Sequence, residues 1–365
     1  MKKKLIFGVV IATVALMFSA CGSSRIQKAT SERLDLEKTV RCIPSLASLE
    51  VRPTRVTATA YASELTGLNA EEQKQALVAK ALATVNGDVM VAPQFTTAKG
   101  ADGKMTSMTV TGYAATIKSF RPMTEADVAF DETLLDKTYQ ETQGRKVVNT
   151  MTVADVEFSG KKSVALTPVE MVNKNEAQAL KLAKEKLLRQ EKADVLYHAQ
   201  YSVTLDNGKV SAFTLTAFTG KLVNYRKPTK RQQLALKPSA VPAVTFQAIA
   251  ADIKTVAPRC QLKFGTGNTQ AKESELKETA RAAALKKYNA DFLLNETFYF
   301  DYQEKVITHV TICGTPAVYA NFRPLVEGEV VDVRLLPFKG EGAPREEQSA
   351  VGSILDIFGG LFKRK

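Results

Sequence analysis

The sequence predicts an α+β protein of three tandem repeats, each with the order strand or strands, helix, strand, strand. One observation is a pair of marks, an aspartate and a downstream aromatic–arginine pair, that occurs three times along the 365 residues. The second is a change of period: a helical pattern precedes each aspartate, and alternation with period two follows it. We therefore expect three antiparallel sheets, each covered by one helix.

The repeated marks keep a nearly constant spacing. The aspartates are Asp88, Asp194 and Asp291, and the arginines are Arg121, Arg226 and Arg323. Each aspartate precedes its arginine by 32 or 33 residues. As surface positions, the arginines would bind phosphates or carboxylates. As structural positions, each aspartate would cap the helix–strand junction and each arginine would end a strand. We favour the structural interpretation, because a repeated position usually serves the folding pattern.

The helices are predicted over 69–85, 174–191 and 270–288, where Ala, Leu, Lys, Glu and Gln dominate. In each range the apolar residues fall on one stripe and Lys and Glu lie opposite, as in a helix that covers a sheet. Asn69, with Glu72 three residues later, predicts a capping box at the start of the first helix.

Strands are predicted on both sides of each helix. Residues 209–218 alternate apolar and polar side chains directly after the hairpin signal at 206–208, and 102–103 mark the same turn in the first repeat. The matching segments 46–60 and 153–167 place one or two strands ahead of the helix. Because one helix covers only one face of a sheet, each repeat is expected to pack on a neighbour or a partner.

These elements divide the whole chain. We expect a signal peptide at 1–20, a lipid anchor and tether at 21–44, repeats at 45–122, 151–228 and 241–324, linkers at 123–150 and 229–240, and a tail at 325–365. No segment after the signal peptide has 18 uninterrupted apolar residues, so no transmembrane helix is expected.

The N-terminus indicates export. Three lysines precede the apolar stretch 5–18, which has the length of a signal-peptide core. Ser19, Ala20 and Cys21 follow, and they resemble the lipobox of bacterial lipoproteins, with Phe18 where leucine is usual. The resemblance covers residues 1–24 and implies removal of residues 1–20, acylation of Cys21 (a palmitate-type anchor) and attachment to an envelope membrane, facing the periplasm or the cell surface. The alternative is an ordinary secretory signal with an incidental cysteine.

The tail ends in a second candidate membrane contact. Its apolar residues recur with helical spacing at Ile354, Ile357, Phe358, Leu361 and Phe362, before the basic end 363–365. Such an amphipathic stretch suits a membrane surface or the groove of a partner protein. The alternative is that this stretch docks on the third repeat of its own chain.

Two further cysteines, Cys260 and Cys313, fall on two strands predicted for the third repeat. In an oxidising envelope they could form a disulfide. The alternative is a pair of buried thiols, since the other two repeats lack both cysteines and are expected to fold without them.

Composition narrows the function classes. Two histidines leave few candidates for histidine-based catalysis or a metal site, and we expect no cofactor and no metal. The formal charge is +12, or +9 once residues 1–20 are removed, but Lys and Arg are interleaved with Glu, so no nucleic-acid partner is expected. Anionic envelope polymer or an envelope protein is the partner class that fits.

We therefore expect a non-catalytic envelope lipoprotein that acts as a binding or assembly module through its repeated domains. One alternative is an envelope enzyme with a carboxylate-based site between repeats. Another is a redox or metal sensor built on Cys260 and Cys313.

Overall fold

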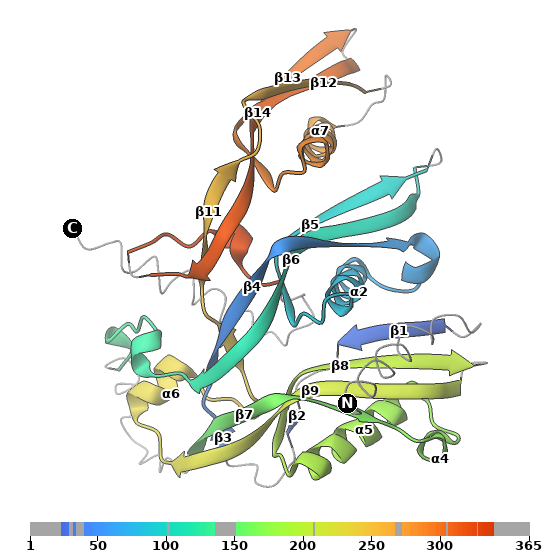
Figure 1. Cartoon of the computed structure of the whole chain (residues 1–365). Coiled ribbons are helices and arrows are strands. Elements are labelled where there is room, and N and C mark those ends of the chain that lie inside the picture. The colour runs from blue at the N-terminus through green and yellow to red at the C-terminus, as the bar shows by residue number, and fades with distance from the viewer. Residues whose placement is uncertain are drawn as a thin grey trace, which may run out of the picture.

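A computed structural model describes residues 23–28, 32–33, 40–100, 103–135, 151–206, 209–266, 272–303, 306–326 and 328–338. The described strands form three sheets, which we name A, B and C (Figure 1). The signal peptide, Cys21 and the amphipathic stretch of the tail lie outside the described residues.

Sheet A has the strand order β1-β8-β9-β7-β3, with β2 beside β8. Its strands are β1 (Ser23–Lys28), β2 (Glu32–Arg33), β3 (Val40–Cys42), β7 (Thr152–Ala165), β8 (Val195–Asp206) and β9 (Lys209–Arg226). The polar segment expected as part of a tether thus includes β1, which pairs antiparallel with β8 from Ser23 to Lys28.

Sheet B has the order β10-β4-β6-β5, and in sheet C both β11 and β12 pair with β14, as does β13. The strands of sheet B are β4 (Ser45–Tyr61), β5 (Val89–Lys99), β6 (Met105–Pro122) and β10 (Val244–Phe246). Those of sheet C are β11 (Ile249–Thr255), β12 (Cys260–Gly265), β13 (Phe292–Gln303) and β14 (Val306–Pro324).

Three of the helices are long. They are α2 (Ala70–Ala83), α5 (Glu176–Glu191) and α7 (Glu273–Tyr288). Each lies inside a range that the sequence predicts as helical. The capping box is confirmed, because Asn69 accepts from the backbone N–H of Glu72 at 2.9 Å and Glu72 accepts from that of Asn69 at 2.8 Å. The shorter helices are α4 (Pro168–Met171), α6 (Lys230–Leu236), η2 (Ala62–Leu65), η3 (Glu125–Asp127) and η4 (Val333–Leu335).

The predicted fold class is wrong. The protein is mainly β, with 52% of the described residues in strands and 26% in helices, and it is not an array of antiparallel sheets each covered by a helix. Two sheets are mixed, since β3 pairs parallel with β7 and β10 pairs parallel with β4. The main strands are also long: β4, β6, β9 and β14 contain 17 to 19 residues. With strands of this length, each sheet contains many more strand residues than the one long helix beside it contains helical residues.

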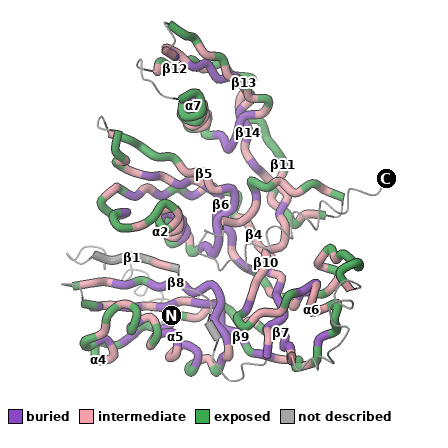
Figure 2. Tube along the Cα trace, turned by 180° about the vertical axis from the view of Figure 1, so that it is seen from behind, coloured by how far each residue is buried: buried purple, intermediate pink, exposed green. Residues whose placement is uncertain are grey.

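The three sheets form a stack in the order C, B, A, which is not their order along the chain (Figure 1). Seen from either side, α7 lies between sheets C and B and α2 between sheets B and A, while α5 covers the outer face of sheet A (Figures 1 and 2). Buried residues run through the stack along the strands (Figure 2). The chain thus builds one continuous body from three sheets.

Each sheet bends at the same place. The first strand after each long helix carries one residue with a left-handed backbone, at Ala92, His198 and Asn295 with φ of 50°, 53° and 51°. Non-glycine residues adopt this conformation at a cost, so tertiary contacts must hold it. Strand register shifts at these points, which marks β-bulges. The first residues of β5, β8 and β13, just before these bulges, pack against the neighbouring sheet of the stack.

Candidate interaction surfaces

The three repeated aspartates make the same hydrogen bond within their own sheets. Each lies between the end of a long helix and the next strand. Its Oδ2 accepts from a backbone N–H of the sheet's longest hairpin strand, with these pairs: Asp88 and Ile117 at 2.9 Å, Asp194 and Leu222 at 2.8 Å, Asp291 and Tyr319 at 2.8 Å. Each aspartate therefore fixes its helix–strand junction to the longest hairpin strand of its own sheet.

In two of the three aspartates, the other carboxylate oxygen binds a cation from the neighbouring sheet. Asp88 Oδ1 lies 2.7 Å from Lys161 Nζ of sheet A, and Asp291 Oδ1 lies 3.0 Å from Arg55 Nη1 of sheet B. Both aspartate side chains are only 2% exposed. We call these contacts the BA junction (Asp88–Lys161) and the CB junction (Asp291–Arg55).

The two cations occupy equivalent positions. Arg55 and Lys161 each follow a register shift in the first long strand of their sheet. In the strand register, Arg55 pairs with Tyr113 and Lys161 pairs with Phe218. Two residues after each of these aromatic residues, a backbone carbonyl accepts from the N–H of the repeated aspartate of the same sheet. The two junctions are therefore two copies of one contact, each joining the aspartate side of one sheet to the cation side of the next.

Aromatic side chains reinforce both junctions. At the BA junction Phe120 packs on Phe218 with ring centroids 5.2 Å apart, and at the CB junction Phe322 packs on Tyr113 at 4.7 Å. Tyr113 also donates its hydroxyl to Asp291 Oδ2 at 2.6 Å. Burial raises the pKa of Tyr113, and the hydrogen bond to Asp291 raises it further. The tyrosine therefore stays a donor to this carboxylate.

Backbone carbonyls at the aspartates accept further bonds from the next sheet. His198 Nε2 lies 2.6 Å from the carbonyl oxygen of Asp88, and the Gln94 side-chain amide donates to the carbonyl oxygen of Asp291. His198 is buried. One of the two histidines of the chain thus takes part in the BA junction.

The end sheets of the stack differ at the corresponding positions. On sheet A, no Lys or Arg among the described residues forms an ion pair with Asp194, and Leu222 and Ala154 at this end are buried in one cluster with Val40 and Cys42 of β3. On sheet C, Arg259 lies between β11 and β12, at the position that matches Arg55, and it is exposed.

The three repeated arginines bind acids of their own chain. Arg121 and Arg323 each form a two-nitrogen contact with an acid six residues later, Asp127 and Glu329. Arg226 Nη2 lies 2.8 Å from Asp155 Oδ1. The hydrogen bonds from Arg121 lower the pKa of Asp127 to about 2, and those from Arg323 lower the pKa of Glu329 to about 2. These guanidinium groups secure the strand ends.

Of the two alternatives for Cys260 and Cys313, the structure has buried thiols without a disulfide between them. In the register of β12 and β14, Cys260 pairs with Gly314 and Cys313 pairs with Gln261. Because successive strand residues point to opposite faces, the two thiols point to opposite faces of sheet C. Cys260 lies in the cluster that includes Ala280 and other residues of α7.

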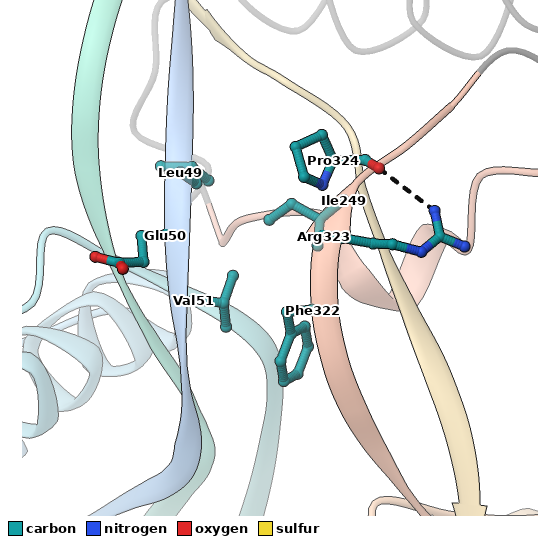
Figure 3. A pocket seen from close by; sticks show the side chains of 7 residues that line it. All are labelled: Leu49, Glu50, Val51, Ile249, Phe322, Arg323 and Pro324. Atoms are coloured by element: carbon teal, nitrogen blue, oxygen red, sulfur yellow. Dashed lines mark hydrogen bonds between the residues drawn. The ribbon is translucent and has the colours of Figure 1, made fainter.

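A shallow cleft lies between sheets B and C (Figure 3). It is lined by Leu49, Glu50, Val51, Ile249, Phe322, Arg323 and Pro324. Its volume of about 220 Å³ falls below the roughly 300–1,000 Å³ of common small-molecule sites. At the matching place in the BA junction, Phe158 fills the space and packs on Phe120 at 4.4 Å, so the smaller Val51 accounts for the cleft.

The cations of the junctions were not among the residues that the sequence analysis singled out. Arg55, Lys161 and Arg259 fall where the alternation of a strand is interrupted, and a proline precedes the two arginines at Pro53 and Pro258. That interruption was the available signal. The described part of the chain holds no cluster of three or more His, Cys, Asp or Glu side chains placed for a metal ion. None of its helices is long and apolar enough to cross a membrane.

No family model, no curated protein and no solved structure matches this chain.

Proposed function

We propose that this chain is an exported envelope lipoprotein that serves as a non-catalytic binding and assembly module, anchored through acyl chains on Cys21. The observation that carries the proposal is the repeated junction. Two of the three recurring aspartates join sheets to one another, at Asp88–Lys161 and Asp291–Arg55, and neither of them lines the cleft between sheets B and C. A body made by repetition of one contact offers surfaces for assembly.

The start of the described chain supports an anchor close to the stack. Ser23, two residues after Cys21, already pairs with Leu205 in sheet A. Two residues span at most about 7 Å, so acyl chains on Cys21 would hold the edge of sheet A near the bilayer. The partners that we propose are envelope proteins or anionic envelope polymer, in keeping with a net charge of +9 after removal of residues 1–20.

A Cys21→Ser variant tests the anchor. We expect it to move from the membrane fraction to the soluble periplasmic fraction, because one substitution removes the only acylation site that the lipobox provides. A Ser24→Ala variant, changed three residues away, is the matched control and should remain with the membrane. A Cys21→Ser protein that still sediments with membranes would contradict the proposal.

Crosslinking in intact cells tests the assembly role. We expect crosslinked species that contain an envelope component, in amounts that fall when Cys21→Ser releases the chain from the membrane. A chain that crosslinks to nothing in the envelope would contradict the role as a binding or assembly module.

A further inference from the structure

We infer that this protein forms a two-fold symmetric dimer, in which the β13 strands of two copies pair antiparallel at the edge of sheet C. The inference rests on the proposed assembly role and names the partner as a second copy of this chain. It comes from the edge of β13, which no other strand of the described chain covers, whereas the matching edge of sheet A carries an added strand.

The matching edge of sheet A belongs to β8. The strands β8 and β13 are equivalent, because each begins directly after a repeated aspartate and each contains 12 residues. β1 pairs antiparallel with β8 from Gln200 to Leu205, and β2 continues in the same register at Val195 and Leu196 (Figure 1). An edge of this kind therefore accepts an antiparallel strand over nearly its whole length.

The matching edge of sheet B belongs to β5 and is protected in two ways. At its start, Val91 forms an antiparallel bridge with Pro337 of the segment that follows β14. Further along, β5 contains Pro93 and Lys99, residue types that discourage pairing at a sheet edge. The sequence of β13 contains no Pro, Lys or Arg, and in the described part of the chain β13 pairs only with β14. Sheet C thus lacks the protection that its two counterparts have.

The outer part of β13 is rich in aromatic residues. After its bulge, β13 ends in the segment 297–303, which we call the β13 tip and in which four of seven residues are aromatic. Tyr299 and Tyr302 are 60% and 56% exposed. The one charged residue of the tip, Asp301, already has a cation, since its Oδ2 lies 2.7 Å from Lys263 Nζ of β12. An aromatic edge strand with little charge is a surface for pairing with another strand.

Two copies of the β13 tip fit one another when the two-fold axis passes through Phe300 at its centre. All seven residues of each tip then overlap, with Phe298 opposite Tyr302 and Tyr299 opposite Asp301 of the other copy. Directly opposite residues lie on the same face of a sheet, and aromatic pairs placed in this way stabilise it. An axis through Asp301 would set two acids opposite one another, which disfavours that register.

Charges on α7 complement the same register. Arg281 Cζ lies 5.5 Å from the centroid of the Phe298 ring, and Glu273 accepts from the Tyr302 hydroxyl at 2.6 Å. Lys277, one turn from each of these helix residues, lies 3.9 Å from Glu273. Because Phe298 of one copy is opposite Tyr302 of the other, the basic end of this contact in one copy faces the acidic end in the other.

The two α7 helices leave room for the pairing. Ala280 and Ala284 of α7 pack in one cluster with Val310 and Ile312 of β14, so the helix lies over β14 and not over the edge. In the dimer, three strand spacings of roughly 4.8 Å would separate the two helices, or roughly 14 Å. Packed helices lie about 8–10 Å apart, so neither helix obstructs the other.

The symmetry also places both copies the same way round. The two-fold axis of the pair is perpendicular to sheet C, and α7 lies between sheets C and B (Figures 1 and 2). The axis therefore points from sheet C toward sheets B and A, and the two stacks lie side by side. Ser23, at the start of β1 in sheet A, is then at the same end of both copies, as two acylated chains in one bilayer require.

Sedimentation velocity of the full chain in detergent, over a wide concentration range, tests the dimer. We expect single copies and dimers and nothing larger, because a two-fold contact closes on itself. Tyr299→Glu should raise the dissociation constant by about tenfold or more, because it sets an acid opposite Asp301 twice in each dimer. Tyr299→Lys should keep the dimer, because it sets a base there instead.

Tyr61→Glu is the matched control. Tyr61 is 64% exposed and ends β4, away from the β13 edge, so this variant should dimerise like the parent. Thermal unfolding of Tyr299→Glu at the parent's temperature establishes that its fold is intact.

Introduced cysteines test the register. A Tyr299→Cys copy mixed with an Asp301→Cys copy should form a disulfide-linked dimer on oxidation, because opposite Cα atoms of an antiparallel pair lie about 4.5–5.5 Å apart. Either variant alone should crosslink at least tenfold less, because its two cysteines would lie diagonally, at or beyond the limit of about 7 Å for a disulfide.

Three results would overturn the inference: a single copy at every concentration, a dimer that Tyr299→Glu leaves unchanged, or single cysteine variants that crosslink as well as their mixture. A chain that stays a single copy in detergent, and whose position 299 crosslinks in cells to a different envelope protein, would overturn the dimer alone. The proposed function would then stand, with that protein as the partner at this edge.

Discussion

At Asp88, one buried carboxylate serves two elements at once. One oxygen accepts from a strand of its own sheet and the other binds Lys161 of the neighbouring sheet, at 2.9 and 2.7 Å. A carboxylate that is 2% exposed is costly to leave buried without a partner cation. The junction therefore depends on its cation more than an exposed ion pair would.

Replacement of that cation should destabilise the stack. We expect Lys161→Met to lower the free energy of unfolding by about 3 kcal/mol, because it leaves Asp88 buried without its cation. The matched control is Lys162→Met, which removes a side chain that is 43% exposed and lies 3.6 Å from Glu191, and which should cost about 0–1 kcal/mol. Chemical denaturation measures both. Equal losses for the two variants would show that the BA junction does not depend on this pair.

The pair Arg121–Asp127 predicts a specific pH dependence. The hydrogen bonds from Arg121 lower the pKa of Asp127 from 3.8 to about 2. Because the folded-state pKa is the lower one, the pair stabilises the fold above the ordinary pKa and loses that effect as pH falls from about 4 toward 2.

Carboxyl NMR titration of an Arg121→Gln variant tests the cause of that shift. We expect the pKa of Asp127 to rise toward the ordinary value of about 3.9. Glu329, which Arg323 holds at a pKa of about 2, serves as the internal control and should not move. An Asp127 pKa that stays near 2 in the variant would rule out Arg121 as its cause.

Among the elements, those with a long periodic pattern were predictable and the short ones were not. The helices α2, α5 and α7 contain 14, 16 and 16 residues, which is about four turns each, and each lies in a range with regular apolar spacing. The strands β3 and β10 contain three residues each, which is too short for any period to show. These short strands make sheets A and B mixed, and with the length of the main strands they are why the predicted fold class failed.

A glycine in β9 shows how closely the elements of sheet A pack. The backbone carbonyls of Ala115, Gly220 and Ala317 each accept from the N–H of the repeated aspartate of their own sheet. Gly220 of sheet A therefore occupies the position that an alanine occupies in sheets B and C. A Cβ at Gly220 would lie 2.8 Å from Val156 and 3.1 Å from Phe158. Val156, Val195 and Phe158 together leave no room for a Cβ at this position.

Gly220→Ala should therefore lower the free energy of unfolding by about 1–3 kcal/mol through overpacking. Gly160→Ala, in the bulge of β7 of the same sheet, is the matched control, because a Cβ there meets nothing within 4 Å. The control should be neutral or slightly stabilising. Thermal and chemical unfolding measure both variants, and a Gly220→Ala protein as stable as the parent would contradict the packing argument.

At the scale of the whole molecule, the sequence shows the recurring aspartates and arginines but not the order of the stack. The aspartates and arginines were visible because their spacing recurs. The order C, B, A was not, because it depends on which sheet receives Arg55 and Lys161, and nothing near those residues in the sequence identifies the acids that they bind. Contacts between residues far apart in the chain carry no local period, so the junctions could be found only in the structure.

The pairing of β1 with β8 has a mechanical consequence. The strand begins at Ser23 and runs antiparallel to β8 through Lys28. A pull on the chain from the side of Cys21, directed along β1, would load its backbone hydrogen bonds together in shear, whereas a pull across the sheet would open them one at a time. An edge strand of six residues can in this way transmit tension from the N-terminal end of the chain to the stack.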